Sequence, residues 1–197
     1  HLENSHVLPA MIRKVYLAKC LSEDDWAAVR KDIGLRPVTM KGTELRVDAD
    51  SSEQDILTVL ASYGIEKGRV TLWGTGAPMR EFLWSEEMAD ASVHVLLNVD
   101  FKDTYAPGER DIRNCHINVG TGKELSIREV AEKIMAEIGF KGELCWDASK
   151  PDGTMRKLTD VTKLHRLGWH HTVEIDEGVH RLYEWYLKGI CINHQGH

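Results

Sequence analysis

The sequence has few cysteines and no long apolar run. Its four cysteines are scattered along 197 residues, and no two have the C-x-x-C spacing of a zinc or redox motif. We therefore expect reduced thiols and a cytoplasmic protein. No stretch approaches the roughly 18 consecutive apolar residues of a membrane helix, so no membrane span is predicted. The chain has no initiator methionine and starts at His1 almost within a helix pattern, which favours a fragment of a longer protein.

Basic residues are in the minority. The 25 Lys and Arg residues face 31 Asp and Glu, and the net charge is −6. A surface that neutralises nucleic-acid phosphates is therefore not expected. A small anionic ligand is still compatible with this charge, because it needs only a few local cations. The ten histidines show no H-x-x-x-H spacing with an acidic third ligand, so no metal site is predicted.

Two motifs of coenzyme chemistry are not expected in this chain. No G-x-G-x-x-G stands between a strand and a helix, as a dinucleotide pyrophosphate site requires. Gly120-Thr-Gly122 lacks the third glycine, and we interpret it as a tight turn. We also expect no Tyr-x-x-x-Lys pair placed to protonate a carbonyl, since Tyr16 and Lys19 are one residue too close.

Short strands and amphipathic helices follow one another, which predicts an α/β chain. A capping box, Ser126-Ile-Arg-Glu129, marks one helix start, and Gly139 marks its end. Ser85 is predicted to cap another helix, and residues 20–68 are interpreted as a self-contained α/β insertion. Ser51 or Ser52 is predicted to cap a helix that runs to about Tyr63. The further predicted helices are 7–19, 26–33, 159–167 and 174–187. The predicted strands are 69–73, 115–119 and 144–146, with a hairpin over 37–47.

Three segments carry residues suited to ligand chemistry. The first, Trp73-Gly-Thr-Gly-Ala-Pro-Met-Arg-Glu-Phe82, combines a flat aromatic face at Trp73 with the forked cation of Arg80. An arginine reads phosphate oxygens bidentately, and an aromatic face stacks on a base or sugar. A plain turn in which Arg80 pairs with Glu81 or Glu87 is an equally good interpretation of this spacing.

The second segment runs from Asp147 to Lys157. Its three cations, Lys150, Arg156 and Lys157, stand in a Pro-Gly loop that could cradle a pyrophosphate, or could be an ordinary solvated loop. The third feature is His6, just before the first helix. Its imidazole suits acid–base work near neutral pH, although a lone histidine is more often a structural hydrogen-bonding residue.

Together these segments resemble the GDP-L-fucose synthases, a branch of the extended short-chain dehydrogenases/reductases. The resemblance rests on Ser5-His-Val-Leu-Pro-Ala-Met-Ile-Arg-Lys14, the Trp73–Phe82 segment, His116-Ile-Asn-Val-Gly-Thr-Gly122 and Asp147-Ala-Ser-Lys-Pro-Asp-Gly-Thr-Met-Arg-Lys157. The Pro-Met before Arg80 and the Lys-Pro-Asp-Gly-Thr stretch are the most specific to this branch.

The resemblance implies a function. These enzymes epimerise GDP-4-keto-6-deoxy-D-mannose at C3 and C5 and then reduce its C4 ketone with NADPH, which gives GDP-L-fucose. His6 corresponds to the acid that reprotonates the sugar and lies near the nicotinamide. Lys14, Trp73, Arg80 and Lys157 correspond to contacts with the GDP-sugar. The resemblance also implies a cytoplasmic, multifunctional enzyme that forms a homodimer as the full-length protein.

The departures from that family shape the prediction. Its Gly-rich NADP loop, its Ser and Tyr-x-x-x-Lys set and its epimerase cysteine have no counterpart here, so the Rossmann half is expected to be absent and this chain alone inactive. Residues 1–19 and 69–197 are predicted to form the sugar-nucleotide-binding region. Residues 20–68 are a possible lid or interface element, or a surface elaboration, and Trp84-Ser-Glu-Glu87 replaces the family's His-Val-Asp-Asp.

Two alternatives remain open. The chain could belong to another sugar-nucleotide epimerase or dehydratase of the same superfamily. It could also be a non-catalytic module that binds nucleotide sugars.

Overall fold

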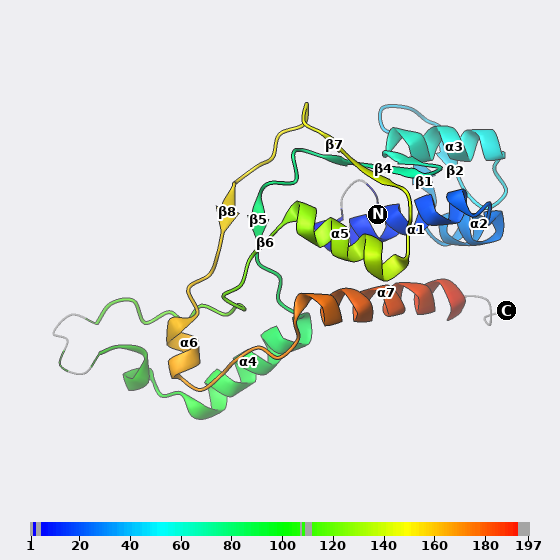
Figure 1. Ribbon diagram of the computed structural model, residues 1–197. Coiled ribbons are helices and arrows are strands. Elements are labelled where there is room, and N and C mark those ends of the chain that lie inside the picture. Colours follow the sequence, from blue (N-terminus) through cyan, green and yellow to red (C-terminus); the bar gives the residue numbers. More distant parts are fainter. Residues whose placement is uncertain (1, 3–4, 107, 109–111, 193–197) are drawn as a thin grey trace. The chain divides into compact units, whose positions relative to one another are not determined.

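The computed structural model describes residues 2, 5–106, 108 and 112–192 (Figure 1). The chain divides into two compact units. The first consists of His1–Ala77, Arg128–Gly153 and Val179–His197, and the second of Pro78–Ile127 and Thr154–Gly178. Helices and strands occur in both units, so the predicted α/β class is confirmed.

Three helices open the first unit: α1 (Val7–Ser22), α2 (Trp26–Leu35) and α3 (Glu53–Ser62). Asp25 caps α2 by accepting a hydrogen bond from the Ala28 amide. Ser52 caps α3 in the same way with the Asp55 amide, as the sequence predicts. The predicted hairpin is confirmed by β1 (Val38–Thr39) and β2 (Arg46–Val47), which pair antiparallel.

A three-stranded sheet, ordered β3-β4-β7, lies in the same unit. Strand β3 (Ile65–Glu66) pairs antiparallel with β4 (Arg69–Trp73), and β4 pairs parallel with β7 (Glu143–Asp147). Helix α1 contacts α2, β3 and β4. The buried side chains of α1, α3 and β4, among them Val15, Leu60 and Val70, form the apolar interior of this unit.

Helix α5 (Ile127–Ile138) ends at Gly139, whose φ of 74° is the left-handed conformation that stops a helix. Helix α7 (Ile175–Ile192) is the last described element. Its Tyr186 donates a hydrogen bond of 2.6 Å to the Asp32 carboxylate, which is fully buried and also binds Arg13 at 2.8 Å and Arg36 at 3.2 Å. This carboxylate therefore joins α1, α2 and α7.

The second unit holds a sheet ordered β6-β5-β8. Strand β5 (Met79–Arg80) pairs antiparallel with β6 (Leu125–Ser126) and parallel with β8 (Arg156–Lys157). The helical elements are α4 (Ser85–Asn98), the 3-10 turn η1 (Phe101–Thr104) and α6 (Thr162–Arg166). Ala91, Leu164 and Trp169 form its buried apolar cluster.

Four local predictions were wrong or incomplete. Residues 115–119 form no strand; Ile117 and Val119 pack on the apolar cluster, and Lys163 binds the His116 carbonyl that a ladder would use. Arg156 and Lys157 were placed in a loop but form β8. The N-cap of α4 is Trp84 rather than Ser85. Helix α6 is shorter than predicted, because Asp160 accepts the Thr162 amide at its start.

Within the described residues, no helix is long and apolar enough to span a membrane.

Candidate functional site

Strands β4 and β7 end at the same edge of their sheet. They run parallel in a register that places Trp73 opposite Asp147. The Gly74 amide donates to the Asp147 carbonyl at 2.9 Å, so the two loops that follow start side by side. Ligands of open α/β sheets bind beyond the carboxyl ends of parallel strands. The first and second predicted segments thus meet at an edge suited to binding.

Asp152 ties these two loops together. Its carboxylate accepts the Thr75 amide and the Thr75 hydroxyl, both at 2.7 Å. These bonds lower the pKa of Asp152, the backbone bond having the larger effect. Gly74, with φ of 80°, lies so close that an added Cβ would stand 2.3 Å from the Asp152 oxygen. A side chain at residue 74 would therefore break the contact.

Trp73 is presented outward. Its side chain is 64% exposed although it ends a strand whose alternate residues are buried. The Lys150 ammonium stands 5.9 Å from the centre of the Trp73 ring. An exposed flat ring with a cation beside it can stack on a base while the cation meets an anionic group.

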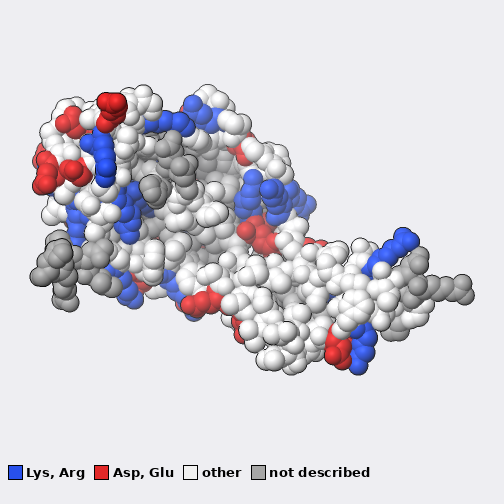
Figure 2. Space-filling model, turned by 180° about the vertical axis from the view of Figure 1, so that it is seen from behind, with Lys and Arg blue, Asp and Glu red and all other residues white. Residues whose placement is uncertain are grey.

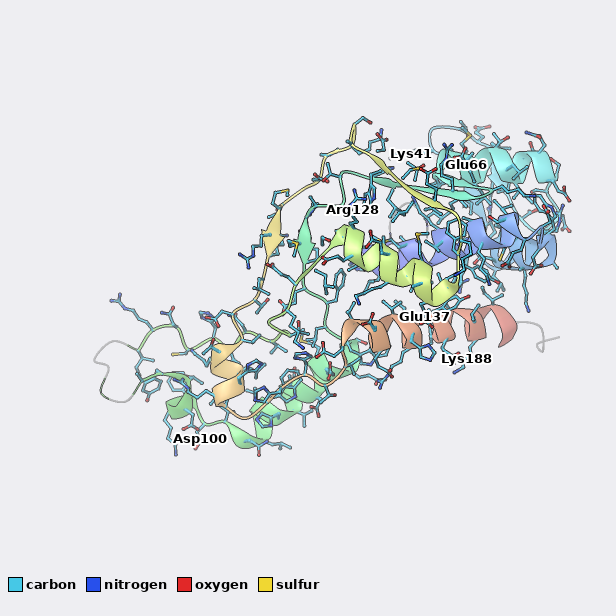
Figure 3. All side chains as sticks on the ribbon, in the orientation of Figure 1. Lys41, Glu66, Asp100, Arg128, Glu137 and Lys188 are labelled. Carbon is cyan, nitrogen blue, oxygen red and sulfur yellow. The ribbon has the colours of Figure 1, made fainter. Side chains whose placement is uncertain are left out.

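The loop after β4 rests on a second tryptophan. An added Cβ at Gly76, where φ is 78°, would meet the Trp146 ring at 2.7 Å. Arg128, in the first turn of α5, lies over the same ring at 4.8 Å and donates to the Thr75 carbonyl at 2.8 Å (Figure 3). The loop backbone is therefore held from below by Trp146 and from the side by Arg128.

In the second unit, the predicted residues Arg80 and Lys157 are direct neighbours. They are register partners in the parallel pair β5–β8. Arg80 donates to the Met79 carbonyl at 2.7 Å, and Lys157 is exposed without a hydrogen bond or ion pair to the described part of the chain. Arg156 pairs instead with Glu124 at 2.7 Å. Two cations thus stand together on one sheet, as an anionic ligand would require.

Glu81 does not neutralise Arg80. Its carboxylate accepts the amides of Thr121, Gly122 and Thr159 at 2.6, 2.7 and 3.0 Å. Burial by itself would raise the Glu81 pKa, but these bonds outweigh it and hold the pKa below its ordinary value. The Gly120-Thr-Gly122 turn is therefore confirmed as a turn, and it is wrapped around this carboxylate.

The other proposed partner of Arg80 is also used elsewhere. Glu87 accepts the Val173 amide and the Thr172 hydroxyl at 2.9 Å each. The interpretation of the Trp73–Phe82 segment as a turn with an Arg80–Glu81 or Arg80–Glu87 pair is therefore wrong for the structure described.

His6 and Lys14 lie at opposite extremes of exposure. His6 is the exposed N-cap residue of α1, and its side chain makes no capping hydrogen bond. Lys14 is buried on α1 and donates to the Tyr63 carbonyl at 2.6 Å. Burial lowers the pKa of Lys14 to about 8. In this structure Lys14 therefore secures the end of α3, within residues 20–68.

Contrary to the prediction, the sequence contains one Tyr-x-x-x-Lys spacing, at Tyr63-Gly-Ile-Glu-Lys67. Tyr63 is the C-cap of α3 and its hydroxyl donates to the Thr39 carbonyl at 2.7 Å. Lys67 follows β3 and pairs with Asp24 at 2.7 Å. The two residues do not share a helix face, and each binds a different partner.

Several residues of this site were not singled out in the sequence, namely Thr75, Arg128, Trp146 and Asp152. The Lys-Pro-Asp-Gly stretch contains Asp152, but the prediction for this stretch rests on its cations. Among the described residues, no group of three or more His, Cys, Asp or Glu could hold a metal ion. Trp84, which departs from the family pattern, donates to Glu86 at 3.1 Å.

Charge is distributed in small groups. On the face shown in Figure 2, Lys and Arg side chains form separate clusters among acidic and uncharged ones. Basic residues therefore stand in local groups, and the Arg80–Lys157 pair of β5 and β8 is one such group.

Comparison with known proteins identifies the family of the chain. Residues 17–120 match the model of the NAD dependent epimerase/dehydratase family. The chain belongs to this family. The match starts at residue 17, and the expected absence of a Rossmann half is not confirmed by it.

Individual relatives show which branch of this family the chain is similar to. GDP-L-fucose synthase 1 of Arabidopsis thaliana is 37% identical over 191 residues, which are 97% of this chain and 42% of that protein. GDP-L-fucose synthase of Escherichia coli strain K12 is 46% identical over 119 residues, 60% of this chain and 36% of that protein. The resemblance seen in the sequence is confirmed. The chain spans less than half the length of either relative.

A solved structure covers nearly all of the chain. It is MlghC, a GDP-mannoheptose C4 reductase from Campylobacter jejuni with NADP bound. The identity is 36% and the TM-score 0.78, over 95% of this chain and 48% of that one. A match of that extent includes most of residues 20–68, so this segment is part of a fold shared with another member.

Proposed function

We propose that this chain supplies the sugar-nucleotide-binding part of an NADP-dependent enzyme that converts GDP-4-keto-6-deoxy-D-mannose to GDP-L-fucose. The observation that carries the proposal is the pairing of Arg80 with Lys157 on neighbouring strands, with neither cation neutralised by a described carboxylate. Two adjacent cations suit a diphosphate, and Arg can bind it through two parallel hydrogen bonds.

The other residues have complementary roles in the proposal. Trp73 stacks on a flat part of the nucleotide, because its ring is exposed and the loops beside it are held by Asp152 and Arg128. Contact of Lys14 with the sugar nucleotide stays a prediction, and it requires the ammonium to exchange the Tyr63 carbonyl for the ligand.

His6 is the proposed acid. Removal of a proton next to the C4 ketone produces an enolate, and epimerisation is completed when a proton returns to the opposite face. The His6 imidazole is exposed, and imidazole is the side chain that most often serves as a general acid in enzymes. Its role is to hold that proton at one ring nitrogen and to release it to the sugar carbon.

The two parallel strands of the first unit, β4 and β7, offer no cradle for a dinucleotide. Strand β4 is followed by β5 and strand β7 by β8, so neither runs through a glycine turn into a helix. We therefore derive no step through NADP for this chain. We propose that the coenzyme, which supplies the hydride for C4 reduction, is held mainly by a separate coenzyme-binding half, with His6 at its edge.

A second candidate is a C4 reductase that acts on a GDP-linked heptose. The match to the C. jejuni reductase at a TM-score of 0.78 over 95% of the chain favours it. Both candidates use the same nucleotide and the same cations. They differ in the sugar. We propose residues 20–68 as a lid or interface element near that sugar.

The proposal is tested by two measurements on this chain. With NADPH and GDP-4-keto-6-deoxy-D-mannose, we expect no NADPH oxidation, and turnover by the chain alone would contradict its assignment as the binding part. In calorimetry, Arg80→Gln and Lys157→Gln are expected to weaken GDP binding about tenfold each. Arg46→Gln, at an exposed arginine of β2, is the matched control. Equal GDP affinity of the wild-type chain and the three variants would contradict the proposal.

The remaining features concern the full-length enzyme. We propose that it is a homodimer, that it works in the cytoplasm and that both epimerisation and reduction occur in one protein. Another sugar-nucleotide epimerase or dehydratase would bind UDP or dTDP more tightly than GDP. A non-catalytic module would bind GDP yet show no reaction when joined to a coenzyme-binding half.

A further inference from the structure

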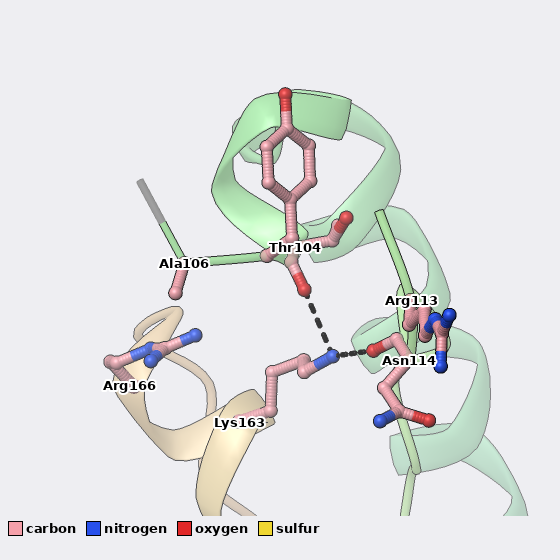
Figure 4. Close-up of a pocket in the computed structure, with 7 residues that line it drawn as sticks. Thr104, Ala106, Arg113, Asn114, Lys163 and Arg166 are labelled. Atoms are coloured by element: carbon pink, nitrogen blue, oxygen red, sulfur yellow. Dashed lines mark hydrogen bonds between the residues drawn. The ribbon is translucent and has the colours of Figure 1, made fainter. Parts of the chain in front are cut away.

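Lys150 follows β7 in the first unit and is exposed, and its ammonium makes no hydrogen bond or ion pair with the described part of the chain. Lys163 in the second unit is the opposite case. Its ammonium donates to the carbonyls of Thr104 and Asn114 (Figure 4) and to that of His116. An ammonium has three protons, so the chain itself uses all those of Lys163. Those of Lys150 are available to a ligand.

The backbone that carries Lys150 is fixed on both sides. The Lys150 amide donates to the Asp147 carbonyl at 3.1 Å, which closes a tight turn directly after β7. Within this turn the Asp147 carboxylate accepts the amide and the hydroxyl of Ser149, at 3.1 and 2.5 Å. On the other side, Asp152 accepts the Thr75 amide at 2.7 Å. The backbone position of Lys150 is therefore set before a ligand arrives.

This turn places the Lys150 ammonium beside the Trp73 ring. Trp73 ends β4 and is the register partner of Asp147, the first residue of the turn. The ammonium stands 5.9 Å from the centre of the exposed ring. Stacked aromatic rings have centres about 4.5–7 Å apart, which is the same range of distances. A base that stacks on Trp73 would therefore bring its edge within reach of Lys150.

Guanine is the base whose edge suits a lysine best. An ammonium has donors only, and guanine presents two adjacent acceptors, O6 and N7. Adenine presents N7 beside an amino group, which is itself a donor and cannot accept from an ammonium. Thymine presents the single acceptor O4 beside a methyl group. A lysine next to the stacked base therefore favours a guanine nucleotide.

We propose that Lys150 determines the base specificity of the site by donating to O6 and N7 of a guanine that stacks on Trp73. The inference rests on the proposed GDP-sugar function and extends it. The cations Arg80 and Lys157 act on the diphosphate, which is the same in every nucleoside diphosphate, so they do not distinguish bases. Loss of Lys150 therefore changes which nucleotide is preferred.

The test is calorimetry of the chain with GDP, IDP and ADP. IDP keeps O6 and N7 and lacks only the 2-amino group of guanine. We expect GDP and IDP to bind with similar affinity and ADP about tenfold more weakly. Lys150→Met should reduce the ratio of GDP affinity to ADP affinity to less than about twofold. Lys150→Arg should keep the ratio, because a guanidinium also binds O6 and N7.

Two further variants serve as controls. Lys141→Met removes an exposed lysine just before β7, at the opposite end of the strand from Lys150, and should behave like the wild-type chain. Lys157→Gln should weaken the binding of all three nucleotides by the same factor and leave their ratio unchanged. Thermal unfolding confirms that each variant is folded.

An unchanged ratio of GDP to ADP affinity in Lys150→Met would overturn the role of Lys150 and leave the proposed GDP-sugar function standing. IDP that binds as weakly as ADP would overturn it as well, because the 2-amino group would then be the feature recognised. Absence of GDP binding by the wild-type chain would contradict the proposed function and, with it, this inference.

Discussion

Asp152 and Thr75, 77 positions apart, are joined by two hydrogen bonds of 2.7 Å from one carboxylate to the amide and hydroxyl of one residue. The contact connects the loop after β7 to the loop after β4, directly beside the exposed Trp73 ring. It gives the Lys-Pro-Asp-Gly stretch a structural role that its cations do not suggest. In our account, Asp152 positions the loop that presents Trp73.

Replacing Asp152 by Ala should therefore weaken GDP binding while the fold persists. We expect a loss between about two- and tenfold, because an exposed contact contributes little by itself. Asp147→Asn is the control, since the Asp147 carboxylate bonds to Ser149 and not to Thr75. Calorimetry with GDP measures both variants. An unchanged affinity for Asp152→Ala would remove the positioning role.

The same contact has a defined pH dependence. The pKa of Asp152 is lowered in the folded state, so its contribution is complete above the unfolded carboxyl pKa of about 3.9 and is lost as pH falls through the lower folded value. Between about pH 5 and 8 the two hydrogen bonds from Thr75 to Asp152 should stay intact. Carbon NMR of the Asp152 carboxyl should report a titration midpoint below that of a model peptide. A midpoint at or above the peptide value would contradict the claim that the Thr75 hydrogen bonds stabilise the ionised Asp152 carboxylate.

Gly76 isolates the effect of the Trp146 contact. Gly76→Ala adds a Cβ 2.7 Å from that ring at a φ of 78°, whereas Gly42→Ala has φ of 75° and nothing within 4 Å. Both carry the cost of a left-handed alanine, about 1–2 kcal/mol. We expect Gly76→Ala to lose about 1–3 kcal/mol more in urea unfolding. An equal loss of unfolding free energy in both variants would show that the Trp146 ring moves away from the new Cβ at little cost.

The buried Asp32 carboxylate should dominate the stability of the first unit. Asp32→Ala leaves Arg13 buried without its partner, which costs about 3–5 kcal/mol. Asp24→Asn breaks an exposed pair with Lys67 and should change stability by about 1 kcal/mol or less. Chemical denaturation compares the two. A similar small change for both would mean that the Arg13–Asp32–Tyr186 network contributes little.

Lys14 should make stability depend on alkaline pH. Burial lowers its pKa to about 8 from 10.5, so the folded state binds this proton less tightly than the unfolded state. The resulting penalty is complete below pH 8 and disappears as pH rises to 10.5. Relative to Lys14→Met, the wild-type chain should gain about 1–3 kcal/mol across that window. Urea unfolding at both ends of the window tests this, and a pH-independent difference contradicts it.

Local features were predictable from the sequence, and long-range contacts were not. The Ser52 cap, the Gly139 helix end and the strand ending at Trp73 follow from residue types and short spacings. The α/β class follows from the order of such elements. By contrast, β8 exists only because β5 offers it a partner strand, in which Met79 lies 77 positions before its register partner Arg156. Residues 115–119 alternate like a strand, but their carbonyls and side chains find other partners.

The residues of the candidate site also fall into those that the sequence predicts and those that it does not. Trp73, Arg80 and Lys157 were identified by side-chain chemistry and by resemblance, and the structure places Arg80 beside Lys157. The carboxylates that support these segments were missed, because Glu81 and Asp152 act on amides 40 and 77 positions away. No local pattern encodes such distances. Lys14 illustrates the opposite case, since its chemistry was recognised but its burial against Tyr63 was not.

The central claim is that this chain binds a GDP-linked sugar, and nucleotide discrimination tests it most directly. Calorimetry should be performed with GDP, UDP and dTDP on the wild-type chain and on Trp73→Ala. We predict that GDP binds at least about tenfold more tightly than UDP or dTDP, and that Trp73→Ala weakens GDP binding. Equal affinity for the three nucleotides, or tighter binding of UDP or dTDP, would contradict the account.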